Sequence, residues 1–451
     1  MDLVKWGIEQ VLYPVMERRK GNRIRPYLKE LQASECLSAS EIEALRLKKL
    51  SRLLHACADK VPASSFLRQE AVGIDADPVS VLRRVAILTK SDYMKNPDSY
   101  LAEGTDPATL IRNKSGGSTS EPVSFYMDRC TVEHFEAARW RGLSWYGISP
   151  GSRCVMIWGN PLEMNQQQFR KYRMKERWLK NRIAFPAYSL KPEAMSGYLA
   201  VINSFGPEYF YGYSSALHTF ATLMQEQKLQ LSFRPKVVVS TSETLHDYQR
   251  DRIAEVFGCP VVNEYGARDG GMIAYQCPMG GMHLCAENLW LELVDEKTGE
   301  PVAEGQSGIV LLTDLNNLSQ PRLRYRVGDR AVRSDARCAC GRELPLLGAV
   351  DGREDDMFLR VDGQYVHGHA FNHVARAMGV LEKFQIVQEA PERAVLKIIP
   401  KPAATRTEVE AFVQGIESLL PGTAIRVEEV TEIPPTASGK YRYAIRRFPL
   451  T

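Results

Sequence analysis

The fold is decided by a stretch of alternating segments between residues 209 and 266. It reads YFYGY (209–213), SALHTFATLMQEQ (215–227), KVVVS (236–240), LHDYQRDRIAEVFG (245–258) and CPVVNEYG (259–266). The short runs of aromatic and β-branched residues predict buried strands, and the longer segments between them predict helices. CVMIW at 154–158 extends the pattern towards the N-terminus. Strands that alternate with helices are typical of an α/β fold with a partly parallel sheet.

More strands, and then a second unit, follow this core. LWLELVD, GIVLLTDL and RYRVGDRAV, all within 289–332, predict a more antiparallel β section. After a highly charged connector the chain begins again with FLRVDGQYV, FQIVQEA, AVLKIIPK, a helix at TEVEAFVQGIESLL and a strand at AIRVEEV. We therefore expect a large domain over 1–350, a charged connector at 351–356 and a small α+β domain over 357–451.

The region before this core, up to about residue 69, is predicted to be helical. Ser38 and Ser40 can cap a helix over EIEALRLKKLSRLLHACADK, whose leucines form an apolar stripe. The first 20 residues predict an amphipathic helix that ends in the basic cluster of Arg18, Arg19 and Lys20. We favour a helix that docks on the body of the protein, and the alternative is a helix that lies in a membrane interface. Charges at positions 2, 5 and 9 exclude a secretory signal.

The composition is that of a globular protein, with 44% hydrophobic and 25% charged residues in a chain of 451. The formal net charge of +4 is too small to indicate a nucleic-acid partner. No apolar run approaches the roughly 18 to 20 residues that span a bilayer. Nine cysteines without a secretory signal indicate reduced thiols and a cytoplasmic protein. Composition leaves the oligomeric state open between monomer and homodimer.

A Ser/Gly-rich loop lies between two predicted strands, LIRN and VSFYM. It reads Ser115-Gly116-Gly117-Ser118-Thr119-Ser120-Glu121-Pro122. Its backbone N–H groups and hydroxyls suit a triphosphate, although an ordinary hairpin loop has the same composition. A Walker loop is excluded because no Gly-Lys-[Ser/Thr] sequence closes it.

Four further segments share the chain with this loop. They are Glu264-Tyr-Gly-Ala-Arg-Asp269, Tyr325-Arg-Val-Gly-Asp329, Gly352-Arg-Glu-Asp-Asp356 and Thr436-Ala-Ser-Gly-Lys440. In their order and spacing, the five segments resemble the motifs of the adenylate-forming superfamily of acyl-CoA synthetases and ligases. VVVSTSETL and Cys338-Ala-Cys-Gly-Arg342 resemble its phenylacetate–CoA ligase-like and capsule-biosynthesis-like branch.

The resemblance implies which residues bind the nucleotide and its magnesium ion. Tyr265 would stack on adenine, Asp329 would hold the ribose hydroxyls, and Asp269 would lie near magnesium, which prefers hard carboxylate oxygens. The remaining nucleotide-binding residues that it implies are Ser115, Gly116, Gly117, Ser118, Thr119, Gly266 and Arg353.

Catalysis and domain movement are assigned by the same resemblance. Lys440 resembles a mobile lysine that bridges the substrate carboxylate and the phosphate, where a cation stabilises the transition state. Asp355 resembles the hinge residue of the family, which implies that 351–356 is a hinge and that the small domain is mobile. Arg268 replaces the family's hydroxyl residue, and an arginine there suits a carboxylate or phosphate. Ser120 replaces a glycine of the family's loop. Asp269 is one methylene shorter than the usual glutamate, which puts direct metal ligation in doubt.

A separate set of thiols and one imidazole predicts a structural zinc site. Cys277 and His283 lie in a glycine-rich turn, and Cys338 and Cys340 lie in a second turn. Four such ligands can hold zinc tetrahedrally and leave no open position. Cys285 competes with His283 for one place, and the alternative is a set of ordinary thiols.

Two further groups have less specific patterns. His367, His369 and His373 follow the connector and could bind a metal, but we favour an entry to a helix from which His367 assists the acceptor. Trp158, Tyr211 and Tyr213 belong to aromatic-rich runs where the resemblance places the acid pocket, and core packing is an equal alternative.

The sequence thus predicts an ATP-dependent ligase that forms an acyl-adenylate with Mg²⁺ and transfers the acyl group. CoA is the expected acceptor, and a carrier-protein thiol or an amine, in polysaccharide or secondary-metabolite modification, is the alternative. A rival class is a non-catalytic zinc-containing protein built on the same fold.

Overall fold

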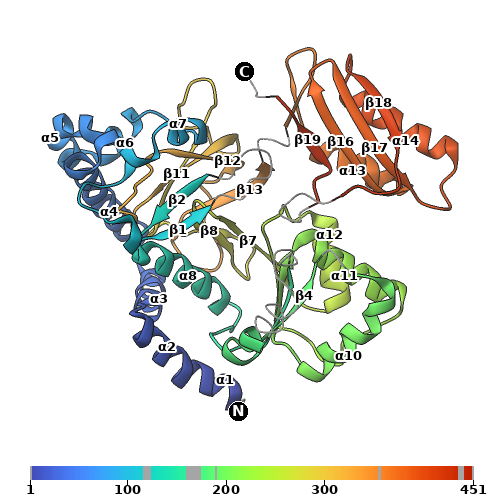
Figure 1. Ribbon diagram of the computed structural model, residues 1–451, viewed down its shortest axis with the longest axis horizontal. Helices are drawn as coiled ribbons and strands as arrows, with labels where there is room; N and C mark the ends of the chain where they lie inside the picture. Colours follow the sequence, from blue (N-terminus) through green and yellow to red (C-terminus); the bar gives the residue numbers. More distant parts are fainter. Residues whose placement is uncertain are drawn as a thin grey trace. The chain divides into compact units, whose positions relative to one another are not determined.

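The protein is described by a computed structural model over residues 3–114, 123–158, 174–187, 190–353, 357–434 and 441–448. These residues form two compact units, and the chain passes from one to the other between Asp351 and Gly352 (Figure 1). Each unit has its own hydrophobic core.

Parallel strands form one half of the sheet in the first unit. They are β3 (Cys154–Trp158), β4 (Arg182–Pro186), β5 (Tyr209–Tyr213), β6 (Val237–Thr241) and β7 (Val261–Ala267), in the spatial order β4-β3-β5-β6-β7. Because β4 and β5 lie on opposite sides of β3, the order in which strands are added to the sheet reverses at β3. Ligands of open α/β sheets bind beyond the carboxyl ends of strands at such a switch point.

Helices cover both faces of these strands. Val238 and Phe210 point to one face, where they pack with α10 (Met195–Phe205), α11 (Ser214–Glu226) and α12 (Asp247–Phe257) (Figure 1). Their neighbours Val237, Val239 and Tyr209 point to the other face, which α3 (Ile24–Ala33) and α8 (Arg129–Ser144) cover. Both faces of the strands are thus buried, which explains why 237–239 is a continuous apolar run.

Antiparallel strands continue the same sheet beyond β7. They are β8 (Gly271–Gln276), β9 (Met282–Leu284), β10 (Leu289–Val294), β11 (Ser307–Asp314), β12 (Tyr325–Arg333) and β13 (Leu346–Arg353), in the order β7-β8-β9-β13-β12-β11-β10. The sheet therefore has eleven strands. A separate antiparallel hairpin of β1 (Ile111–Lys114) and β2 (Ser124–Met127) flanks the Ser/Gly-rich segment.

The N-terminal region is helical, as predicted. It comprises α1 (Leu3–Gly7), a π-helical turn (Ile8–Leu12), α2 (Tyr13–Lys20), α3, α4 (Ala39–Lys60), a 3₁₀ segment (Pro62–Glu70), α5 (Ala71–Ala76), α6 (Pro78–Arg84) and α7 (Lys90–Lys95). Ser38 caps α4 in a capping box with Glu41, whereas Ser40, the other predicted cap, lies inside the first turn. None of the helices described is both long and apolar enough to cross a bilayer.

The second unit is a small α+β structure. Its strands are β14 (Met357–Leu359), β15 (Tyr365–His367), β16 (Leu381–Ala390), β17 (Arg393–Pro400), β18 (Ala424–Glu429) and β19 (Ala444–Arg446), and its helices are α13 (His369–Met378) and α14 (Arg406–Leu419). Four strands form a sheet in the order β18-β17-β16-β19. Phe358, Phe371, Phe384 and Phe412 fill its core. The mixed sheet and the separate α+β unit confirm the predicted fold class.

Candidate active site

Two buried tyrosine–aspartate pairs lie at one end of β7 and along β12. The Tyr265 hydroxyl donates to Asp329 Oδ2 at 2.9 Å, and the Tyr325 hydroxyl donates to Asp269 Oδ2 at 3.0 Å. All four side chains are at least nine-tenths buried. Burial, and then the Asp269 carboxylate, raise the pKa of Tyr325, so that its hydroxyl stays protonated and keeps donating.

Three strands separate β7 from β12 in the sheet, yet their side chains form a hydrogen bond. The antiparallel half must therefore curl back over the end of β7. This curl brings together three carboxylate and aromatic residues that the sequence predicted as nucleotide-binding: Tyr265, Asp269 and Asp329.

Arg322 helps to position the turn that carries Asp269. Its guanidinium donates to the Asp269 carbonyl at 2.8 Å and lies 4.2 Å from the ring centroid of Phe125 on β2. This contact joins the β1–β2 hairpin to the turn after β7. The Asn113 side chain, near the end of β1, donates to the Arg268 carbonyl at 3.3 Å. The strands that flank the Ser/Gly-rich loop are thus attached to the turn that carries Asp269.

Gly266 and Arg268 occupy the same turn. A Cβ atom on Gly266 would lie 2.9 Å from the Gly271 carbonyl oxygen, so this position requires glycine. The Arg268 side chain is exposed, so it is accessible to a substrate carboxylate or phosphate.

Two of the predicted acid-pocket residues, Trp158 and Tyr213, end β3 and β5 at the switch point of the sheet, and Tyr211 lies in the middle of β5. The ring of Trp158 lies 4.3 Å from that of Tyr213 and stacks on that of Tyr211 at 5.7 Å, between centroids. These three aromatic side chains therefore form a single cluster where an α/β sheet binds its ligands.

Glu264 was not among the residues predicted from the sequence, although it lies in a quoted motif. Its Oε1 accepts hydrogen bonds from the Tyr211 hydroxyl at 2.6 Å and from the Thr241 hydroxyl at 3.2 Å. Burial raises its pKa, and the nearby Arg139 guanidinium opposes the rise. Glu264 thus connects the aromatic cluster to the strand of Tyr265. The signal was an acidic residue inside a strand that is mostly buried.

Several predicted residues lie outside the described part of the chain. They are Ser115, Gly116, Gly117, Ser118, Thr119, Ser120, Asp355 and Lys440. His367 ends β15, but its side chain is also outside the described part, as are those of His369 and His373. Arg353 is the last residue of β13 and belongs to the second unit.

The four predicted zinc ligands lie together. The ligand atoms of Cys277, His283, Cys338 and Cys340 are all within 4.8 Å of one another. Cys277 Sγ lies 3.5 Å from Cys338 Sγ, and His283 Nε2 lies 3.2 Å from Cys340 Sγ. A tetrahedral site with Zn–S bonds of about 2.3 Å places neighbouring sulfurs about 3.8 Å apart. The cluster therefore has the dimensions of a closed zinc site.

His283, rather than Cys285, completes this set. Its Nδ1 lies 3.3 Å from the Leu344 carbonyl, which can only accept a hydrogen bond, so Nδ1 carries the proton and Nε2 is left to bind a metal. Cys285 is buried and is not in the cluster. A Cβ atom on Gly281 would lie 2.5 Å from Cys338 Sγ, which explains a glycine in this turn.

Contacts around the cluster tie it to the N-terminal helices. Arg342 forms an ion pair with Glu35 at 2.7 Å and lies over the Trp145 ring at 4.6 Å. The Trp145 ring packs edge-on against His283 at 5.6 Å, and its Nε1 donates to Glu35 at 2.9 Å. The cluster thus fastens the end of α8 and the turn after α3 to the β8–β9 hairpin.

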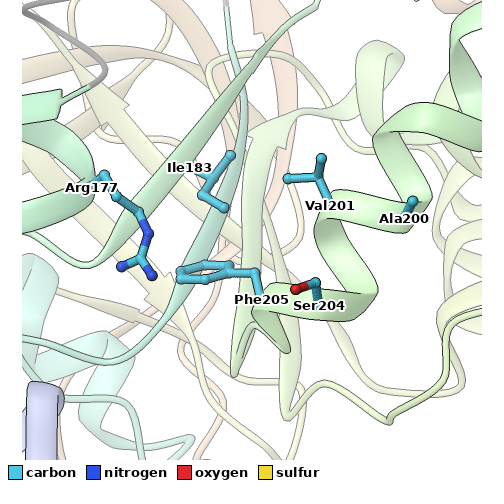
Figure 2. Close-up of a pocket in the computed structure, with 6 residues that line it drawn as sticks. All are labelled: Arg177, Ile183, Ala200, Val201, Ser204 and Phe205. Atoms are coloured by element: carbon cyan, nitrogen blue, oxygen red, sulfur yellow. The ribbon is translucent and has the colours of Figure 1, made fainter.

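A separate open groove of 440 Å³ lies on the first unit (Figure 2). Six residues line it: Arg177, Ile183, Ala200, Val201, Ser204 and Phe205. The Arg177 guanidinium lies 4.7 Å from the Phe205 ring centroid. None of the residues predicted as catalytic or binding lines this groove, so it is distinct from the candidate active site.

The chain is similar in sequence to CapK and to phenylacetate-coenzyme A ligases. Residues 358–447 match the family model of the CapK C-terminal domain. Protein CapK of Staphylococcus aureus is 24% identical over 382 residues, which cover 81% of this chain and 80% of CapK. The phenylacetate-coenzyme A ligase of Thermus thermophilus is 24% identical over 343 residues, which cover 72% of this chain and 73% of the ligase. These relatives confirm the resemblance and the branch predicted from the sequence.

Solved structures show the same fold. A crystal structure of 2-hydroxyisobutyryl-CoA ligase in the postadenylation state, in complex with R3-HIB-AMP, superimposes with a TM-score of 0.68 at 21% identity. The match covers 92% of this chain and 91% of that chain. An anthranilate CoA ligase in complex with anthranoyl-AMP has a TM-score of 0.52 at 19% identity, over 75% and 67% of the two chains.

Proposed function

We propose that this chain, which shares its fold with CoA ligases and its sequence with CapK and the phenylacetate-coenzyme A ligases, is an ATP-dependent ligase that activates a carboxylic acid. The observation that carries the proposal is the pairing of Tyr265 with Asp329 and of Tyr325 with Asp269 beside the aromatic cluster. Buried carboxylates with fixed orientations suit the polar parts of a nucleotide, and aromatic rings suit its base and an apolar acid.

The first half-reaction joins the acid to AMP. An oxygen of the substrate carboxylate attacks the α-phosphorus of ATP, the bond to the β-phosphate breaks, and pyrophosphate leaves. Tyr265 stacks on the adenine, Asp329 accepts hydrogen bonds from the ribose hydroxyls, and Lys440 stabilises the charge that builds on the phosphorus. Magnesium, held at Asp269, would neutralise the phosphate oxygens of ATP.

Other residues orient the two substrates. The β- and γ-phosphates are bound by the Ser/Gly-rich loop, through Ser115, Gly116, Gly117, Ser118 and Thr119. Gly266 and Arg353 contact other parts of the nucleotide. Arg268 is exposed beside Asp269 and binds the acid's carboxylate. Trp158, Tyr211 and Tyr213 enclose the rest of the acid.

The second half-reaction transfers the acyl group to a thiol. The sulfur attacks the acyl carbonyl, the bond to the phosphate oxygen breaks, and AMP leaves. CoA is the acceptor we favour, and His367 assists it. A carrier-protein thiol or an amine, in polysaccharide or secondary-metabolite modification, is the alternative within the same chemistry.

Structural zinc is the second part of the proposal. Cys277, His283, Cys338 and Cys340 fit a tetrahedral ion because their ligand atoms are mutually close and His283 Nε2 is free of a proton. With four protein ligands no position stays open, so the ion holds the fold and takes no part in the reaction. We also propose a cytoplasmic location, where the nine free cysteines of this chain would stay reduced.

Hydroxylamine trapping tests the proposed function. Purified protein is incubated with ATP, Mg²⁺ and single aryl, hydroxy or fatty acids, and the acyl-adenylate is captured as a hydroxamate. We expect a hydroxamate and pyrophosphate with at least one class of acid. Replacing hydroxylamine by CoA, by a phosphopantetheinylated carrier protein or by an amine identifies the acceptor. Pyrophosphate that forms without any acid would contradict carboxylate activation.

A further inference from the structure

Residues 3–20 form a continuous helical segment with unusually many exposed apolar side chains. α1, the π-helical turn and α2 follow one another without a break. Five large apolar side chains are more than one-third exposed: Leu3, Val4, Trp6, Val11 and Val15. Trp6 is 48% exposed and Val11 is 50% exposed. A stable helix that leaves these side chains in water indicates a surface with a partner.

Other side chains of the segment 3–20 contact the body of the first unit. Ile8 is buried against Gly151, where a Cβ atom would lie 3.2 Å from Ile8 Cβ. Lys5 forms an ion pair with Glu208 at 2.9 Å. The segment is thus attached to the first unit and still leaves its exposed apolar side chains in water.

The acidic residues of this segment have partners within the first unit, whereas the exposed charged residues are basic. Glu17 is buried and pairs with Arg25, and the Glu9 carboxylate accepts a hydrogen bond from the Ser149 hydroxyl at 3.3 Å. The exposed charged residues at its end are all basic: Arg18, Arg19, Lys20 and Arg23. The exposed surface of the segment therefore combines apolar side chains with positive charge.

A second segment has the same character and is attached to the same turn. The Asn181 side chain donates to the Gly151 carbonyl at 2.9 Å, and Gly151 is also the contact of Ile8. In the helical segment 174–179 that precedes it, Trp178 is 66% exposed and Met174 is 62% exposed. Lys175 is exposed beside them, whereas the exposed Lys180 forms an ion pair with Glu176 at 2.7 Å.

We propose that these two segments bind the surface of an anionic lipid bilayer. An interfacial helix needs apolar side chains, tryptophan at the headgroup level and basic residues that face anionic lipids, and both segments have all three. A second copy of the chain is a poorer occupant, because stable protein interfaces bury about 20 to 30 residues a side. The proposal does not depend on the proposed ligase activity.

Vesicle sedimentation tests this binding with the purified full chain. We expect the protein to sediment with vesicles of equal parts phosphatidylcholine and phosphatidylglycerol, and not with phosphatidylcholine alone. Binding should be lost when salt is raised from about 0.1 M to about 1 M, because the screening length falls from about 10 Å to about 3 Å.

Two variants remove the two kinds of contact separately. Each basic residue near an anionic surface strengthens binding by roughly fivefold, so R18S/R19S should weaken it on the order of 25-fold. W6S/V11S, which keeps the basic residues, should not bind the anionic vesicles even at low salt. Val72→Ser is the matched control, because Val72 is 84% exposed on α5, away from both segments. All variants should keep the circular dichroism and melting temperature of the wild type.

Several outcomes would overturn the proposal. One is the absence of sedimentation with anionic vesicles. Another is equal binding by wild type, W6S/V11S and V72S. A third is a wild-type dimer that W6S/V11S converts to a monomer without any vesicle binding, because a second copy would then occupy the surface. Acid-dependent pyrophosphate release, measured without vesicles, reports on the ligase proposal independently.

Discussion

His134 shows how burial of one side chain makes stability depend on pH. The imidazole is buried on α8 and stacks on Tyr27 of α3 with 3.8 Å between ring centroids. Burial is the largest cause that lowers the pKa of His134 from 6.5 to about 4. The folded protein therefore keeps this ring neutral at a pH where the unfolded chain already binds a proton.

We predict that His134 destabilises the protein in mild acid. Its stabilising contribution is complete above pH 6.5 and is lost as the pH falls from 6.5 to 4, by on the order of 3 kcal/mol. His134→Asn should lower stability at pH 7, and its difference from wild type should shrink towards pH 4. Denaturant unfolding at several pH values measures this. His55→Gln, at a half-exposed histidine of α4, is the control. A pH-independent difference between His134→Asn and wild type would contradict the assignment.

Single residues could be predicted from motifs, but their partners could not. Tyr265, Asp269 and Asp329 were identified by the segments in which they lie, because a motif preserves local order. The hydrogen bond from Tyr265 to Asp329 and the contacts of Glu264 depend on how distant strands meet. Likewise, the sequence could not decide between His283 and Cys285 as a ligand, since both follow Cys277 closely. The positions of the two side chains in the structure decide for His283.

The two turns that carry the zinc ligands act as a structural element. They join the β8–β9 hairpin to the segment before β13, and Arg342 and Trp145 extend the contact to Glu35. A metal that bridges segments so distant in the sequence stabilises the folded state directly, because the unfolded chain has no preformed site.

We predict that Cys338→Ser loses zinc and stability but keeps the chemistry. A loss on the order of 2 to 3 kcal/mol lowers the melting temperature of a unit of this size by roughly 3 to 4 °C. Elemental analysis of protein purified without added metal should find one zinc per wild-type chain and much less in the variant. Cys36→Ser, at an exposed thiol, is the matched control. Wild-type protein that is folded and free of metal would restore the interpretation of ordinary thiols.

The positions of strands and helices agree closely with those predicted from the sequence, whereas the arrangement of the strands in one sheet was not predicted. The predicted strands at 154–158, 209–213 and 236–240 are β3, β5 and β6, and only the last is shifted, by one residue. That the antiparallel section continues the parallel half as one eleven-stranded sheet was not predicted. The pattern of apolar residues indicates which residues of a strand are buried. The order of strands in a sheet depends on pairing between distant segments, which produces no periodic pattern in the sequence.

At the scale of the whole molecule, two compact units are joined at Asp351 and Gly352. We propose that the segment 351–356 is a hinge, because the two half-reactions bring different groups to the same carbonyl. Adenylation needs Lys440 at the phosphate, and transfer must admit a bulky acceptor instead. A few changes of φ and ψ in the hinge would allow both.

Asp355→Pro should therefore separate the two half-reactions. Proline fixes φ near −65° and removes the rotation at this position. We expect the variant to form the acyl-adenylate and to lose acyl transfer. Single-turnover assays measure the two steps separately, and Asp355→Ala, which leaves the backbone free to rotate, is the control. An equal loss of both steps in a well-folded proline variant would rule out the hinge.

Acid-dependent exchange of labelled pyrophosphate into ATP is the most direct test of carboxylate activation by this chain. Wild-type protein should catalyse the exchange only when its acid is present. Lys440→Ala should lose two to three decades of the exchange rate, since one transition-state charge contact is worth about 3 to 4 kcal/mol, while ATP binding stays nearly unchanged. Exchange at nearly the wild-type rate in Lys440→Ala, or exchange that needs no acid, would contradict the account.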